Sequence, residues 1–184
     1  MSKYFGMYRI ETTRFRSWDY SWEGKYFITV CTRNFDNYFG EISNGKMELS
    51  EIGSEVERQW VKTILLRPDM NLTLEDFQVM PNHFHAIIEI GPNIYNVKKS
   101  DFISDGKSRN KFSSQSKNLG SIIRGFKAAV TTFANDNNLK FGWHPRFHDH
   151  LIRNDMELFK IKKYIQNNVE NWSKDRFSKN NKFR

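Results

Sequence analysis

Two histidines separated by one residue, His83 and His85, have the types and spacing that most clearly suggest chemistry. They stand within residues 79–90, where β-branched and aromatic residues follow a Pro-Asn break, a pattern that predicts a strand. Because side chains alternate along a strand, both imidazoles should lie on one face and Phe84 on the other. Imidazoles that are neutral near pH 7 bind divalent metals, so the pair predicts half of a metal site. Histidines on a sheet face are also common without a metal, so the pair alone does not establish one.

A second group of polar side chains is expected on a helix near the carboxyl terminus. Asn154 can cap this helix, with Glu157 reaching back in a capping box. An apolar stripe runs along the helix through Leu158, Ile161, Ile165, Val169 and Trp172. Tyr164 and Asn168 are four residues apart at the edge of that stripe, so the phenol and the carboxamide should face the same part of the sheet. A tyrosine at such a margin usually serves packing alone, and that interpretation stays open at this point.

Three further histidines, His144, His148 and His150, lie in or near a strand expected at residues 147–153. His148 and His150 alternate in the same way as the first pair and should share a strand face. Spacing alone therefore leaves them open as ligands or as bases.

The elements that must position these groups follow from hydrophobic periodicity. Strands are expected at residues 26–32, 72–79 and 83–90, and a hairpin turn at Asn44-Gly45 joins residues 38–42 to 46–49. Helices are expected at residues 51–67, ended by Pro68, and at 119–137. The order of these elements predicts an α+β fold, a ferredoxin-like antiparallel sheet with helices packed mainly on one face.

Composition predicts the kind of partner and the compartment. The chain has 184 residues, which suits one domain over residues 1–184. A formal net charge of +8 and an aromatic content of 15% favour nucleic acid as a partner. The single cysteine, Cys31, can form no internal disulfide, and no apolar run has the length of a membrane span. A cytoplasmic protein without a membrane partner is therefore expected.

Two basic segments are expected to extend from this domain. Residues 1–24 interleave basic and aromatic side chains without a clear period, which is typical of an irregular arm. Residues 91–118 are rich in serine and lysine and contain few apolar residues, so they are expected to form a mobile basic loop.

Taken together, the motifs resemble those of a known family. His83-Phe84-His85 followed by Tyr164 resembles the single-tyrosine HUH transposases, most closely the REP-associated tyrosine transposases. Residues 143–153 are similar to that family's Trp-x-x-x-Phe-x-(Asp/Glu)-His-x-Ile-Arg signature, and Tyr164-Ile165-x-x-Asn168 is similar to its Tyr-Ile-x-x-Asn-Pro motif. Val169 stands where those relatives usually carry proline. The resemblance spans about residues 20–172.

The resemblance implies an HUH-endonuclease fold and a metal-dependent single-stranded DNA endonuclease and strand transferase. In this reading Tyr164 is the nucleophile that forms a 5′-phosphotyrosine intermediate on hairpin-bearing DNA, and His83, His85 and Asn168 hold Mg²⁺ or Mn²⁺. Asp149 and His150 would support the site. A homodimer is left open, because relatives build the site within one subunit or across two.

Phosphate contacts are expected from basic residues near these motifs, although each could equally be a solvated charge. The candidates are Arg124, Lys127, Arg146 and Arg153. A non-catalytic, domesticated protein that binds hairpin DNA or RNA is the main alternative function. A metal-dependent hydrolase that uses water in place of tyrosine is a third.

Overall fold

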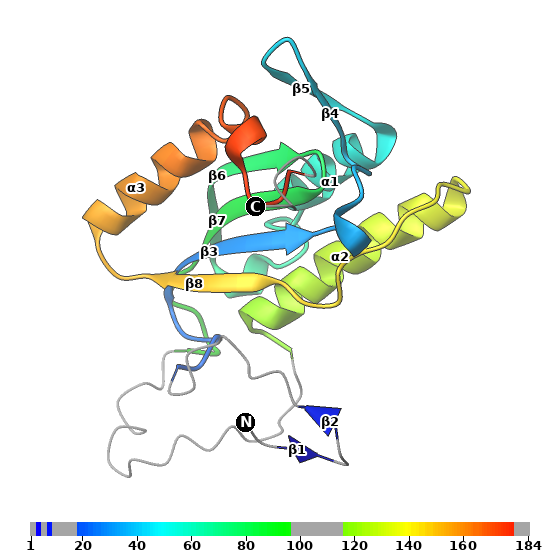
Figure 1. Ribbon diagram of the computed structural model, residues 1–184. Coiled ribbons are helices and arrows are strands. Elements are labelled where there is room, and N and C mark those ends of the chain that lie inside the picture. Colours follow the sequence, from blue (N-terminus) through cyan, green and yellow to red (C-terminus); the bar gives the residue numbers. More distant parts are fainter. Residues whose placement is uncertain (1–2, 5–6, 9–17, 97–115, 179–184) are drawn as a thin grey trace.

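A four-stranded antiparallel sheet forms the centre of the molecule (Figure 1). The computed structural model describes residues 3–4, 7–8, 18–96 and 116–178. The strand order is β6-β7-β3-β8, where β3 is Gly24–Cys31, β6 is Leu72–Met80, β7 is His83–Ile90 and β8 is His148–Ile152. The α+β antiparallel fold expected from the sequence is confirmed.

Two helices, α1 (Glu51–Lys62) and α2 (Leu119–Asp136), cover one face of the sheet, and α3 (Asp155–Gln166) lies on the other (Figure 1). Each helix begins at a side-chain cap: the side chains of Ser50, Asn118 and Asn154 accept hydrogen bonds from backbone amides of the first turn. Such caps satisfy amides that have no partner within the helix. The local sequence therefore defines where each helix starts.

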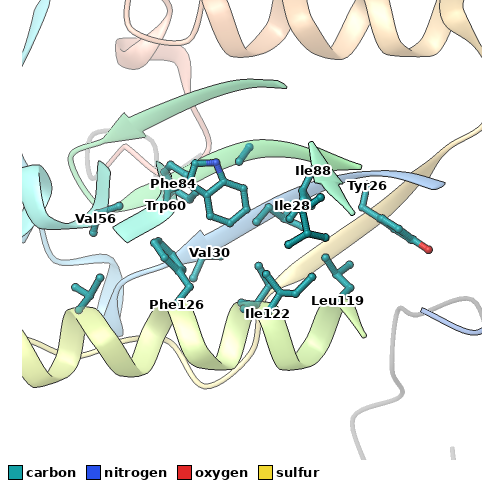
Figure 2. Packing of buried hydrophobic residues seen from close by; sticks show 14 of the residues in the cluster. Tyr26, Ile28, Val30, Val56, Trp60, Phe84, Ile88, Leu119, Ile122 and Phe126 are labelled. Carbon is teal, nitrogen blue, oxygen red and sulfur yellow. The ribbon is translucent and has the colours of Figure 1, made fainter. Parts of the chain in front are cut away.

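The main hydrophobic core lies between the sheet and the helices α1 and α2. Figure 2 shows Tyr26, Ile28 and Val30 of β3 facing α2, with Trp60 of α1 against Phe84 of β7. Side chains alternate between the two faces along each strand, so the same strands present a different set of side chains to α3.

The α3 face of the sheet combines a small apolar cluster with polar residues. Ile87 and Ile152 pack against Ile165 of α3. Further along the same face, His85 pairs in register with Thr29, and Thr29 with His148. Residues paired across neighbouring strands share a face, so the histidines of β7 and β8 lie on the side that α3 covers.

The remaining elements are short. They are the hairpins β1 (Lys3–Tyr4) with β2 (Met7–Tyr8) and β4 (Gly40–Ser43) with β5 (Lys46–Leu49), and the 3₁₀ helices η1 (Arg33–Phe35), η2 (Pro68–Met70) and η4 (Trp172–Lys174). Asn44 and Gly45 adopt φ values of 51° and 73°, as an Asn-Gly hairpin turn requires. None of the described helices has the length and hydropathy needed to cross a membrane.

Both α1 and α3 end earlier than the sequence pattern suggested. The backbone after Lys62 turns, and Leu65 is 78% exposed, because these residues no longer have a buried face. The helix α3 ends at Gln166, so Val169 and Trp172 do not continue its apolar stripe. The arm at residues 1–24 is described only at β1, β2 and residues 18–24, and residues 97–115 of the expected loop lie outside the described part of the chain.

Candidate active site

His83 and His85 are buried side by side beneath α3, with ring centroids 4.5 Å apart and exposures of 0% and 1%. Burial lowers the pKa of His83 well below its usual value and lowers the pKa of His85 to about 3. Both imidazoles are therefore neutral over the physiological range, which is the form that binds a metal.

Asn82 fixes which nitrogen of His83 carries its proton. Its amide nitrogen donates to the carbonyl oxygens of Phe35 (3.0 Å) and Phe177 (2.8 Å), so its side-chain oxygen is the atom that faces His83. Nδ1 of His83 lies 2.9 Å from that oxygen and must donate to it. Nε2 of His83 then carries a buried lone pair that has no hydrogen-bond partner among the described residues. A buried acceptor left without a partner is a strong indication of a ligand position.

His85 contacts the side chain of Tyr164. Its Nδ1 lies 2.8 Å from Oγ1 of Thr29, and its Nε2 lies 3.1 Å from the hydroxyl of Tyr164. The rings of Tyr164 and His85 meet edge to face, and Phe27 packs against both. Burial, followed by the negative charge of Asp175, raises the pKa of Tyr164, so the phenol is protonated at neutral pH.

Tyr164 thus lies against His85, and the residue remains 44% exposed. Asn168 lies two residues beyond the end of α3, where the backbone amides of Asn167 and Asn168 donate to the carbonyls of Lys163 and Ile165. Its side chain is buried, at 2% exposure, and its Nδ2 has no hydrogen-bond partner among the described residues. Asn168 and Tyr164 line the same cleft.

This cleft has a volume of about 650 Å³ and opens beside α3 and the segment that follows it. Its floor is formed by Phe27, Thr29, His85 and His148, and four cations line its walls: Lys160, Lys163, Lys174 and Arg176. An open, positively lined cleft that leads to a phenol suits a phosphodiester substrate.

The segment after α3 supplies residues that the sequence analysis missed. Potential ligand atoms of His83, His85 and Asp175 lie within 4.8 Å of one another. The ring of Phe177 packs against His83, with centroids 4.6 Å apart. Asp175 follows the tyrosine by eleven positions in a segment without periodicity, so the only available signal was a carboxylate beside an arginine and an aromatic residue.

The donor set fits a divalent cation. Two neutral imidazoles, one with an unpartnered Nε2, lie near the carboxylate of Asp175. The buried residue Asn168 lines the same cleft as His85 and Asp175. Burial raises the pKa of Asp175, and its Oδ1 accepts a hydrogen bond from the backbone amide of Phe177 at 2.7 Å. Imidazole nitrogens combined with carboxylate oxygens form a donor set that can hold a divalent cation.

His148 and His150, the second histidine pair, have different surroundings. His148 lines the cleft, whereas His150 is tied to Glu157 through Nε2 and Oε1 at 2.7 Å. The other carboxylate oxygen of Glu157 accepts the backbone amide of Arg153, one residue before the predicted capping-box partner. His150 thus anchors the start of α3 to β8. Asp149 pairs with Ile28 and points to the opposite face of the sheet, so its side chain does not reach the cleft.

The four basic residues expected at phosphates lie outside the cleft lining. Arg124 and Lys127 belong to α2, on the far face of the sheet, and the ammonium of Lys127 donates to the carbonyl of His144 at 2.6 Å. Burial lowers the pKa of Lys127 to about 8. Arg146 and Arg153 are exposed at the two ends of β8. His144 is also outside the cleft, stacked on Phe35.

Comparison with known proteins gives a relative and a fold. No family model matches the chain. An uncharacterized protein of Haemophilus influenzae is 34% identical over 178 residues, covering 92% of this chain and 93% of that protein. Among solved structures, a REP-associated tyrosine transposase bound to a REP hairpin superposes with a TM-score of 0.56 at 21% identity, over 89% of this chain and 74% of that one. The protein therefore belongs to the family of the Haemophilus influenzae protein and has the fold of the REP-associated tyrosine transposases.

Proposed function

We propose that this protein is a metal-dependent single-stranded DNA endonuclease and strand transferase of the transposase type, with Tyr164 as nucleophile. The observation that carries the proposal is the hydroxyl of Tyr164 at 3.1 Å from Nε2 of a buried, neutral histidine, in a cleft lined by four cations. A purely structural role for Tyr164 would not account for two buried neutral histidines beside it or for the open basic cleft that it lines.

His83 and His85 are the proposed metal ligands, with Asn168 and the carboxylate of Asp175 as oxygen donors. A bound Mg²⁺ or Mn²⁺ would polarise the scissile phosphate and stabilise the charge that develops on it. Thr29 and Asn82 hold Nδ1 of the two imidazoles and leave each Nε2 directed at the site. Asp149 has no proposed role in the chemistry. His150 supports the site indirectly, because its bond to Glu157 holds the start of α3 against β8.

The proposed reaction forms one bond and breaks another at the same phosphorus. The oxygen of Tyr164 attacks the phosphorus and loses its proton to solvent, and the bond to the 3′ oxygen breaks as that oxygen takes up a proton from solvent. The strand leaves with a 3′ hydroxyl, while the 5′ phosphate stays on the tyrosine. Attack by a second 3′ hydroxyl reverses the step and joins two strands without an external energy source. The lysines of the cleft wall hold the flanking phosphates.

Hairpin-bearing DNA is the proposed substrate. The solved transposase of the same fold is bound to a REP hairpin, and this chain has a net charge of +8. The alternative is a hairpin-binding protein that does not cut. One observation favours it: Phe177 packs on His83, which is fully buried in this structure, so this proposed ligand is not open to solvent.

Covalent trapping decides between these two functions. Wild-type protein is incubated with a library of labelled hairpin-bearing single strands and Mn²⁺, and protein-linked DNA is resolved on a denaturing gel. We expect an adduct with wild-type protein and none with Tyr164→Phe, which keeps the ring but lacks the hydroxyl. Tyr95→Phe is the matched control, because Tyr95 is a similarly exposed tyrosine whose hydroxyl bonds Asp69 away from the cleft. Binding without an adduct in any protein would favour the alternative.

A further inference from the structure

A second cavity, of about 440 Å³, lies on the face of the sheet opposite the Tyr164 cleft. It is bounded by the end of α1 and the residues that follow, by η2 and by the first turns of α2. Arg67 and Lys117 line it, together with Thr63, Ser121 and Gly125. Nothing in the proposed reaction uses this cavity.

Arg67 is a half-buried cation whose guanidinium has no hydrogen-bond acceptor among the described residues. The nearest opposite charge acting on it is Asp69. That carboxylate is already occupied, because it accepts from the hydroxyl of Tyr95 at 2.8 Å and from the ammonium of Lys117. Burial lowers the pKa of Arg67, and the negative charge of Asp69 offsets this lowering only in part. Leaving a partly desolvated guanidinium without acceptors is costly.

Gly125 creates the space that this guanidinium occupies. A Cβ atom at position 125 would lie 2.3 Å from Nη2 of Arg67, closer than any normal contact. The fold therefore places the donors of Arg67 against the backbone of α2, at the wall of an open cavity. An ordinary surface arginine extends into solvent and needs no such glycine.

We propose that this cavity binds a phosphate group of the nucleic-acid backbone, with Arg67 as donor and Lys117 at its rim. A planar guanidinium with free donors matches phosphate oxygens, and the basic chain already favours a polyanion. The inference rests on the proposed DNA-binding function and extends it to a second contact region. Because the cavity lies across the sheet from Tyr164, it would hold duplex stem phosphates, not the strand that is cut, and it would position the DNA without reading its sequence.

Three variants and a binding titration test this inference. Arg67→Gln removes the guanidinium, and Gly125→Ala keeps the charge but displaces the guanidinium from its place. Arg58→Gln is the matched control, since it removes the same charge from α1 but its guanidinium is paired with Glu55 through two bonds of 2.7 Å. Binding of a labelled DNA hairpin is measured by fluorescence anisotropy without divalent metal at several salt concentrations.

We expect Arg67→Gln to raise the Kd by about tenfold and to reduce the slope of log K against log salt by about 0.9, the value for one duplex phosphate. Gly125→Ala should raise the Kd in the same direction with a smaller effect, and Arg58→Gln should change it by less than twofold. Melting temperatures should stay close to that of the wild type, because Arg67 makes no bond that its loss would break.

Equal losses in Arg67→Gln and Arg58→Gln would overturn the inference, because they would indicate a diffuse effect of net charge. An unchanged Kd in Arg67→Gln would overturn it as well. Both results would leave the proposed cleavage standing, since they require only that the wild-type protein binds the hairpin. Conversely, a wild-type protein that binds through Arg67 but forms no adduct would refute the cleavage and leave the phosphate site in place.

Discussion

Replacing Tyr164 by phenylalanine should strengthen metal binding even though it abolishes the covalent reaction. In the tautomer in which Nδ1 of His85 donates to Thr29, Nε2 carries the lone pair, and it faces the hydroxyl of Tyr164 at 3.1 Å. Thr29 engages the other ring nitrogen, so a metal that binds His85 must take Nε2 and displace the phenol. The wild-type protein must therefore break this hydrogen bond to bind the metal, whereas the Tyr164→Phe variant has no such bond to break.

The size of the effect follows from the value of that hydrogen bond. A hydrogen bond between neutral groups contributes about 0.5–1.5 kcal/mol net, which corresponds to roughly a two- to twelvefold lower Kd for Mn²⁺ in Tyr164→Phe. Free Mn²⁺ is measured by electron paramagnetic resonance in titrations without DNA, with Tyr95→Phe as control. A higher Kd in Tyr164→Phe would refute the reasoning, because it would mean that the phenol helps to hold the metal.

The remaining predictions concern the surroundings of the histidines. Asn82→Ala should raise the Kd for Mn²⁺ by about 10- to 100-fold, because it removes the acceptor that fixes Nε2 of His83 as the free lone pair; an unchanged Kd in the same titration would contradict this. Asn168→Leu and Asp175→Asn should each raise the Mn²⁺ concentration needed for half-maximal cleavage, and whichever leaves it unchanged is not a ligand. The pKa of His85 is lowered in the folded state to about 3, so the unfolded chain binds more protons between pH 6.5 and 3 and stability falls as the pH is lowered through that range. From pH 6.5 to 5 this histidine should cost about 2 kcal/mol, and His85→Gln should show a correspondingly flatter dependence of the melting temperature on pH.

Sequence patterns predicted the parts of the fold that depend on local periodicity. The alternation around Phe84 placed both histidines on one face of β7, and the structure buries Phe84 in the opposite core. The spacing of Tyr164 relative to Ile161 and Ile165 placed the phenol at the margin of α3, where it meets His85. In each case a short, regular element converts spacing directly into direction.

Sequence patterns did not predict where α1 and α3 end, because the end of a helix depends on what the helix packs against. The apolar residues Ile64 and Leu65 extend the pattern of α1 beyond Lys62, but the sheet offers them no surface and they stay exposed. Beyond the end of α3 the side chain of Asn168 is buried, whereas the sequence pattern predicts it at the edge of the apolar stripe of a longer helix. Asn168 therefore reaches the cleft by a route that its spacing from Tyr164 did not describe.

The segment after α3 marks the boundary of what local patterns can predict. Asp175 and Phe177 lie in an irregular stretch, and their place beside His83 is set by contacts with residues far away in the chain. The carbonyl of Phe177 accepts from Asn82, and its ring packs between Phe35 and His83. Because the same Asn82 amide also orients His83, the position of this segment and the free lone pair of the proposed ligand depend on one side chain. A chemical role for Asp175 thus follows from tertiary contacts and from no periodicity in the sequence.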